Sequence, residues 1–350
     1  MNPKTRDLFL TTVLAILLGL IISGFMMLLL GKNPISTYGI LFSSMFRDTY
    51  TIGEIFVKAT PLIFTALAFA FTFKANLFNI GAQGQFYIGA ITAVAISLAW
   101  PSGIAIPFVI IAAFLLSGIW GGLIGFAKAR FNANEFLTSM MSTYIALAIM
   151  NYLLRTSLME TKGEYPQTDT LAKAVWLPRI VPHTRLHLGF LLAVFIAIGI
   201  WLLLYRTSLG FRIRAVGMNS EASSMSGIRP RQIIVISFFI SGGLAGLAGV
   251  TEVNGVQHML LQGFNPSIGS LGIGIAILAN ANPIGIIFAS ILFGALQVGG
   301  SIMGQLSGIP SSIIDLMEGF VMIFVIMSYF VRNKMEVNRD KKHLKEVNEV

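Results

Sequence analysis

The sequence predicts an all-α protein, a polytopic membrane helical bundle with about ten transmembrane helices. Two observations lead to this prediction. The chain of 350 residues is 55% hydrophobic and only 11% charged, with a mean hydropathy of +0.79. Its apolar residues also fall into separate segments, most of them close to the roughly 20 residues that a helix needs to cross a bilayer. We therefore expect one transmembrane domain over residues 1–350 and no separate soluble domain.

Charged and helix-breaking residues mark the ends of the expected spans. The first apolar segment is too long for a signal peptide and lacks a small-residue cleavage site after it, so we interpret it as a retained span. Lys74 follows the second span, Trp100–Pro101 the third and Lys128 the fourth, while Asn282–Pro283 makes the turn between the eighth and ninth. The expected spans are Leu8–Leu30, Ile55–Phe73, Phe78–Ala99, Ile104–Ala127, Glu135–Leu154, Leu188–Tyr205, Ile233–Val253, Pro266–Asn280, Ile284–Gly299 and Ser311–Val331.

The distribution of basic residues predicts the topology. Lysine and arginine are more frequent in the segments that ten spans place inside than in those placed outside, so both termini are expected in the cytoplasm. Pro34–Phe46 is expected to form an interfacial helix on the outer side, and residues 332–350 form a charged cytoplasmic tail. Because the net charge of +9 lies at span ends and in this tail, it fits anionic lipid and not nucleic acid.

The segment 206–231 is a polar island between two long apolar spans on the expected cytoplasmic side. Within it, Asn219 or Ser220 can cap a helix, Glu221 sits in the first turn, and Gly227 is a residue type that ends helices. A short helix is therefore predicted over residues 219–227. An ordinary positive-inside loop is the alternative, but such a loop needs no capped helix. A rigid helix held between two spans suits a soluble partner that pushes on the bundle.

The stretch 76–90, NLFNIGAQGQFYIGA, is rich in amides for a membrane span. Buried amides cost several kcal/mol unless they are hydrogen-bonded, so their face should meet protein or a water-filled path. Pathway lining and cross-linking between helices both remain open. On a continuous helix Gln85 faces the other way, and four residues share one face: Asn76, Asn79, Gln83 and Tyr87.

Three carboxylates, Glu252, Asp315 and Glu318, lie within or near apolar spans. Acids inside a membrane are candidates for function by default, and Glu252 is assigned to the substrate pathway. Asp315 and Glu318 are three residues apart and are expected to share a helix face. Pairing with a polar neighbour and proton coupling are the two interpretations of this pair.

Short similarities within the chain suggest two halves of five spans each. Phe78–Gly81 opens the third span, and the related residues of Phe264–Gly269 open the eighth. Small residues at GxxxG-like spacing predict close helix packing, either within the chain or at a dimer seam. They are Gly118 with Gly122, Gly121 with Gly125, Gly242 with Gly246, and Ala245 with Gly249.

Several catalytic signatures are absent from the sequence. The chain has no cysteine, no phosphate-binding loop for ATP, no HExxH and no GxSxG. We therefore expect a transport subunit and not an enzyme, with no metal site and no cofactor of its own.

Three segments resemble nucleoside-type permeases of ATP-binding cassette importers, which share a broad family with ribose and branched-chain amino acid permeases. They are NLFNIGAQGQFYIGA at 76–90, LGFRIRAVGMNSEASSMSGI at 209–228 and NPIGIIFASILFGALQVGG at 282–300. The similar parts extend over most of Lys74–Gly300. Position 83 is Gln where many relatives carry Glu, so the resemblance supports no charge-based role there.

The resemblance implies a multi-pass protein of the bacterial plasma membrane that imports nucleosides, with guanosine or another purine nucleoside as the expected substrate. It implies three partners: an ATPase subunit that binds ATP and Mg²⁺, a second permease chain in a homodimer or heterodimer, and a substrate-binding lipoprotein. A ribose-type sugar or branched-chain amino acid permease is the alternative within the family, and a carrier driven by an ion gradient is the alternative outside it. The residues expected to couple to the ATPase are Arg212, Arg214, Asn219, Glu221, Ala222, Met225 and Gly227.

Overall fold

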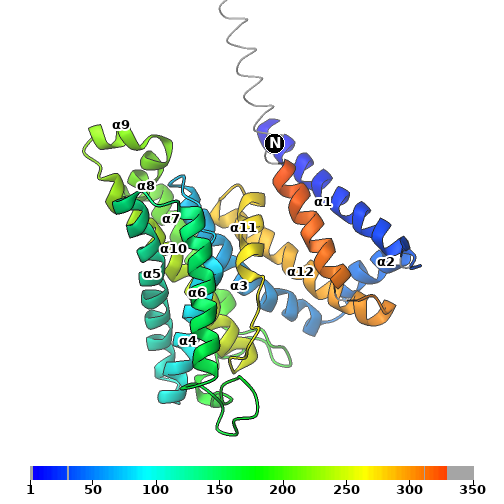
Figure 1. Ribbon diagram of the computed structural model, residues 1–350. Helices are drawn as coiled ribbons and strands as arrows, with labels where there is room; N and C mark the ends of the chain where they lie inside the picture. Colours follow the sequence, from blue (N-terminus) through cyan, green and yellow to red (C-terminus); the bar gives the residue numbers. More distant parts are fainter. Residues whose placement is uncertain (1–2, 30, 311, 329–350) are drawn as a thin grey trace, which may run out of the picture. The chain divides into compact units, whose positions relative to one another are not determined.

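The computed structural model describes residues 3–29, 31–310 and 312–328, which are predominantly helical (Figure 1). Among these residues, seven helices are long and apolar enough to cross a membrane, and Leu14–Leu29 and Ile268–Leu278 are shorter apolar helices. Residues 312–328 are also helical. These ten segments match the ten expected spans, so the prediction of an all-α polytopic bundle is confirmed. The charged tail 332–350 lies outside the described residues.

The chain divides into two compact units, of which the larger is Asp48–Ala295. Its long helices run side by side, with α8 and α9 at one end and the loop between α6 and α7 at the other (Figure 1). This unit contains α3 (Thr49–Phe73), α4 (Ala82–Ala99), α5 (Ala105–Phe131), α6 (Glu135–Leu154), η1 (Lys173–Val175), α7 (Gly189–Arg206), α8 (Ser208–Met218), α9 (Ser220–Met225), α10 (Pro230–Glu252), the π-helical turn η2 (Val253–Gln257), α11 (Ile268–Leu278) and the first part of α12 (Pro283–Ser307).

Helix α10 is the centre of the larger unit, where it packs against α3, α4 and α5. Glycines make this close approach possible. A Cβ atom added to Gly249 would lie 2.5 Å from the backbone nitrogen of Ala90, and one added to Gly121 would lie 3.0 Å from the Cα of Gly242. The residues with GxxxG-like spacing therefore pack helices within the chain, which is one of the two predicted alternatives; the other was a dimer seam.

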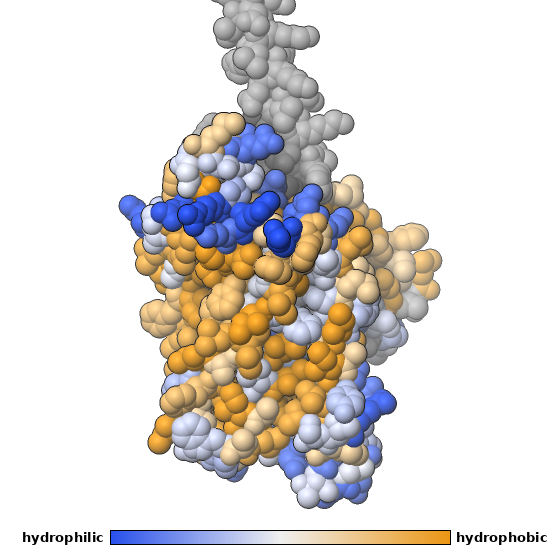
Figure 2. Space-filling view, turned by 60° about the vertical axis from the view of Figure 1, so that its left-hand side comes forward, coloured by the Kyte–Doolittle hydropathy of each residue, from blue (hydrophilic) through white to orange (hydrophobic). Residues whose placement is uncertain are grey.

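The outer helices of the larger unit expose an apolar surface. Figure 2 shows a broad hydrophobic band with hydrophilic residues gathered at its two ends. Helix α3 is almost completely buried, whereas α5, α6 and α7 each leave a wide apolar face uncovered. This pattern is expected of helices that meet lipid on one side and protein on the other. On α5 the exposed apolar side chains are Phe108, Ile111, Leu115, Leu116, Ile119, Leu123 and Phe126.

The smaller unit consists of Met1–Arg47 and Leu296–Val350. It contains α1 (Pro3–Leu29), α2 (Pro34–Met45), the end of α12 and the helical residues 312–328. The predicted helix after the first span is confirmed as α2, which Asn33 caps through a hydrogen bond from the Ile35 N–H to its Oδ1 (3.0 Å).

Asp315 and Glu318 lie three residues apart on one helix, as expected, but they differ in burial. Asp315 is exposed, whereas Glu318 is buried and its Oε2 accepts a hydrogen bond from Gln297 Nε2 (3.3 Å). The two carboxylates therefore lie in different surroundings. Pairing with a polar neighbour, one of the two interpretations of this pair, holds for Glu318.

Candidate functional site

A non-helical segment after η2 brings Asn265 against the start of α4. Asn265 has a φ of +39°, a left-handed conformation that asparagine adopts more readily than most residues. Gln83 binds this region twice. Its Oε1 accepts a hydrogen bond from the Gly269 N–H (2.6 Å), and its Nε2 donates to the Asn265 carbonyl (2.9 Å). Gln83 therefore caps α11 from a neighbouring helix, because Gly269 carries one of the first N–H groups of α11, which have no partner within their own helix.

Glu252 lies on the other side of Asn265. The Asn265 side chain donates from Nδ2 to Glu252 Oε1 (2.5 Å), and the carboxyl residue is only 3% exposed. Glu252 is the last residue of α10 and is followed directly by the π-helical turn η2. Such turns widen a helix and are frequent at functional sites. The second carboxylate oxygen, Oε2, has no hydrogen bond to any described residue.

Charged residues surround this carboxylate on the side of α3. Lys58 on α3 and, less strongly, Arg185 in the loop before α7 attract the Glu252 carboxylate, and the Glu54 carboxylate repels it. Arg185 itself forms a two-pronged ion pair with Glu54, with 2.8 Å between Arg185 Nε and Glu54 Oε1. Hydrogen bonding to Glu54 raises the pKa of Arg185 above its ordinary value. Gln83, Asn265, Glu252 and Lys58 together are called the polar cluster below.

The helical-face argument for Asn79 is wrong. Helix α4 begins at Ala82, so Asn79 precedes it and is not on a common face with the helical residues. Its side chain pairs with Gln85, the residue expected on the opposite side. Asn79 Nδ2 donates to Gln85 Oε1 (2.8 Å) and to Ser241 Oγ (2.7 Å), while its Oδ1 accepts from Gln85 Nε2 (3.2 Å) and the Gly81 N–H (3.0 Å).

The amide pair Asn79–Gln85 joins three helices. Ser241 on α10, which accepts from Asn79, donates in turn to the Ala68 carbonyl on α3 (2.6 Å). Both amide side chains are fully buried, and all four hydrogen-bonding capacities of the Asn79 side chain are used. This geometry is that of a cross-link between helices, which was one of the two interpretations of the amide-rich stretch.

Of the five expected pathway residues, the structure brings three together. Gln83 and Glu252 meet through Asn265, and the buried Tyr87 lies one turn after Gln83, within reach of its amide. Asn79 belongs to the separate cross-link. Asn76 is exposed in the turn after α3, with a φ of +56°, and so takes no part in a common helical face.

The predicted short helix of segment 206–231 is confirmed as α9. Asn219 Oδ1 accepts a hydrogen bond from the Ala222 N–H (3.0 Å) and caps the helix, and Gly227 follows its end with a φ of +80°. Glu221, Ala222 and Met225 are exposed, and the Met225 side chain is 91% exposed. A methionine this exposed on a short, capped helix is available to a protein partner.

A second helix, α8, lies in the same segment and was not expected from the sequence. It packs on the turn that joins α3 to α4, where a Cβ atom added to Gly217 would lie 3.1 Å from the Ala75 Cα. Arg214 on α8 lies over the Tyr205 ring, at 5.3 Å from its centre, whereas Arg212 is exposed. Burial, followed by the charge of Arg214, lowers the pKa of Lys74 in this turn.

Sequence reasoning missed Lys58 and Asn265 as members of the polar cluster. Lys58 carried a usable signal, since a lysine inside an apolar span is a candidate for function by default. Asn265 appeared only as part of the weak internal repeat. In the structure Phe264 of the second repeat copy stacks on Phe86 of α4, which follows the first copy, with ring centres 5.2 Å apart.

Comparison with known proteins identifies similar chains. Residues 51–326 match the family described as the permease component of a branched-chain amino acid transport system. The guanosine ABC transporter permease protein NupP of Bacillus subtilis is 35% identical over 94% of this chain and 96% of its own length. The nucleoside ABC transporter permease protein NupB of Lactococcus lactis is 31% identical, over 95% of this chain and 94% of its own.

A sugar transporter subunit is similar to nearly the same degree. The glucose ABC transporter permease protein TsgB13 of Haloferax volcanii is 30% identical, over 95% of this chain and 91% of its own. No solved structure matches. The family match covers most of the chain, and these relatives align along almost their whole length. The chain therefore belongs to the family of permease components of ATP-binding cassette transporters that includes the branched-chain amino acid permeases.

Proposed function

We propose that the chain is the permease subunit of a bacterial importer for nucleosides, with purine nucleosides such as guanosine as its substrates. The observation that carries this proposal is the polar cluster. Its residues come from α3, α4, the end of α10 and the non-helical segment that leads into α11. Amide side chains hydrogen-bond well to purine edges, and a carboxylate accepts from the ribose hydroxyls or from a base N–H.

The names of the relatives support a nucleoside substrate, since two long matches are described as nucleoside or guanosine permeases. The glucose permease is the observation that favours a sugar as second candidate. Both substrate classes carry sugar hydroxyls, but only a nucleoside offers a base to the amides. A site built to hydrogen-bond one substrate group rejects analogues that lack the group strongly.

Uptake in a strain with and without this gene tests the substrate. Labelled guanosine is expected to enter only when the gene is present, and excess unlabelled inosine or adenosine should compete. Ribose, glucose and leucine should leave guanosine uptake unchanged. Gene-dependent uptake of glucose or ribose that guanosine does not inhibit would replace the nucleoside proposal with the sugar candidate.

Transport would be driven by a partner ATPase, which supplies the site for ATP and Mg²⁺ that this sequence lacks. We propose α9 as the element that receives the force. Motion of α9 would pass to α8, and from Gly217 of α8 to the backbone at Ala75. That turn leads directly into the start of α4, where Gln83 holds the polar cluster. This series of packed contacts would couple α9 to the polar cluster through the start of α4.

Substitutions on α9 test the coupling. Glu221→Arg reverses a charge and Ala222→Trp adds bulk on an exposed surface, so both are expected to abolish uptake and co-purification of the ATPase while the permease still reaches the membrane. Lys162→Glu, an exposed charge reversal in the loop between α6 and α7, is the control and should behave as wild type. Normal import by both α9 variants would show that α9 is not the coupling element.

The remaining partners and the placement follow from the same proposal. The importer would include a second permease chain and a substrate-binding lipoprotein, and this chain would lie in the bacterial plasma membrane with both termini in the cytoplasm. An ion-driven carrier is the competing mechanism. If ATP is held constant, a protonophore should leave short-term uptake unchanged, whereas collapse of uptake under that condition would favour the carrier.

A further inference from the structure

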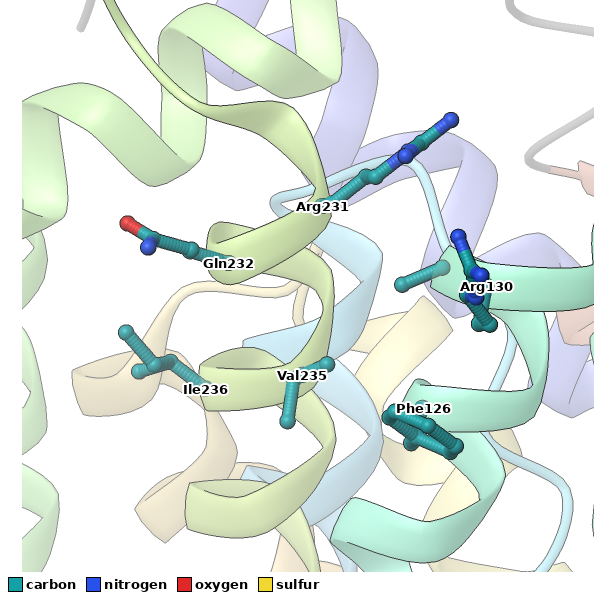
Figure 3. Close-up of a pocket in the computed structure, with 7 residues that line it drawn as sticks. Phe126, Arg130, Arg231, Gln232, Val235 and Ile236 are labelled. Atoms are coloured by element: carbon teal, nitrogen blue, oxygen red, sulfur yellow. The ribbon is translucent and has the colours of Figure 1, made fainter.

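A groove opens at the surface of the larger unit where α5 ends and α10 begins. It has a volume of about 390 Å³. Figure 3 shows α5 and α10 as its two walls, with Arg130 and Arg231 toward one end and Phe126 and Val235 about a turn further along the helices. The complete lining consists of Phe126, Ala129, Arg130, Arg231, Gln232, Val235 and Ile236.

The two arginines of the groove have no acidic partner among the described residues. The nearby carboxylate of Glu135 is already paired with Lys128 at 2.9 Å. Arg130 and Arg231 are both exposed, and they come from different helices. Two uncompensated guanidinium groups on opposite walls match a group with one negative charge and several oxygen acceptors, such as a phosphate diester.

The rest of the groove is apolar and continues into the lipid-facing surface of α5. Phe126 is 52% exposed, and Leu123 and Ile119 extend the exposed apolar row along the same helix. In Figure 2 the hydrophilic layer at one end of this unit directly borders the hydrophobic band. The groove therefore places a cationic rim beside an apolar path, the arrangement of charge and hydrocarbon in a phospholipid.

We propose that this groove is a binding site for a single anionic glycerophospholipid. Its phosphate would lie between Arg130 and Arg231, and one acyl chain would run past Phe126 and Val235 along α5. A soluble protein partner fits the groove less well, because the apolar wall continues into the lipid-facing surface. The site does not depend on the substrate or on the direction of transport, so it can fail or hold independently of the proposed function.

Lipid binding to the purified, full-length protein in detergent tests the proposal. Phosphatidylglycerol and phosphatidylcholine are added separately, and bound lipid is counted by native mass spectrometry. Phosphatidylglycerol is expected to bind at least about tenfold more tightly than phosphatidylcholine. Arg130→Gln with Arg231→Gln should remove that preference, and Arg229→Gln, an exposed arginine outside the groove lining, should retain it.

A second variant separates shape from charge. Val235→Trp fills the apolar part of the groove and leaves both arginines in place, so it should also weaken phosphatidylglycerol binding. Gel filtration and circular dichroism establish that each variant is folded. Unchanged preference in the double arginine variant would overturn the proposal. So would a double variant that keeps the lipid but loses an associated protein subunit, since the groove would then be a protein contact.

Discussion

Removal of the buried amide pair Asn79–Gln85 should destabilise the protein in a way that depends on both residues together. The two side chains exchange two hydrogen bonds, and Asn79 makes two more, to Ser241 and Gly81. Leucine at either position fills a similar volume without hydrogen-bonding groups. The substitutions Asn79→Leu, Gln85→Leu and the double variant therefore test hydrogen bonding rather than packing.

The magnitude follows from the number of bonds lost. Hydrogen bonds between membrane helices contribute about 0.6 kcal/mol each on average, and we apply this value to all four bonds of Asn79, of which the one to Ser241 joins two helices. Asn79→Leu loses four bonds and should cost about 2.4 kcal/mol, and Gln85→Leu loses two and should cost about 1.2 kcal/mol. The double variant should cost no more than Asn79→Leu alone, so the coupling energy of the cycle is expected to be about −1.2 kcal/mol.

The assay is equilibrium unfolding of the purified protein in mixed micelles with rising SDS, followed by tryptophan fluorescence. A matched control pairs Asn79→Leu with Gln83→Leu. Gln83 bonds to Asn265 and Gly269 and shares no partner with Asn79, so the costs of this second pair should add. Additive costs for the Asn79–Gln85 pair, or coupling in the control pair, would refute the assignment of these amides to two separate clusters.

Three further outcomes are expected. Asn265→Asp places a second carboxylate against Glu252 and removes the hydrogen bond between the two residues. Uptake should therefore fall at least about tenfold, while the amount of protein in the membrane stays normal. Unchanged uptake would exclude the polar cluster from the pathway. Burial lowers the pKa of His187 to about 4, with a smaller effect from His258. Burial also lowers the pKa of His258 to about 4. The unfolded chain therefore binds protons on both histidines between about pH 6.5 and 4 that the folded protein does not, so stability should fall as the pH falls through this range, by at most about 1.4 kcal/mol per unit for each histidine. His187→Gln should remove the His187 share of this slope in thermal unfolding at several pH values, and an unchanged slope would contradict the reasoning. Two reporter proteins fused after Val350 test the topology. One that works only in the cytoplasm should show activity, whereas activity of one that works only outside the cytoplasm would contradict the predicted cytoplasmic C-terminus.

The spans, the turns between them and α9 were predictable from the sequence. These features depend on local signals. A run of apolar residues long enough to cross a bilayer has few alternatives to a helix, because every backbone polar group in lipid must be satisfied. In the same way, Asn219 and Gly227 set the ends of α9 through hydrogen bonds and backbone angles within a few residues. Helix α8 was missed because its sequence has no comparable apolar run.

The grouping of the polar residues was decided only by tertiary structure. Periodicity places Asn79 with Gln83 only if one helix runs through both, but the chain turns at Asn76 and α4 begins at Ala82. Which partner a buried amide finds then depends on the helices that pack beside it, here α10 for Asn79 and the start of α11 for Gln83. The sequence by itself determined which segments enter the membrane and that their amides must be satisfied there. Only packing decided that Asn79 binds α10 and that Gln83 binds the segment containing Asn265, which in turn binds Glu252. Hydrogen bonds between helices depend on distances that no local pattern specifies.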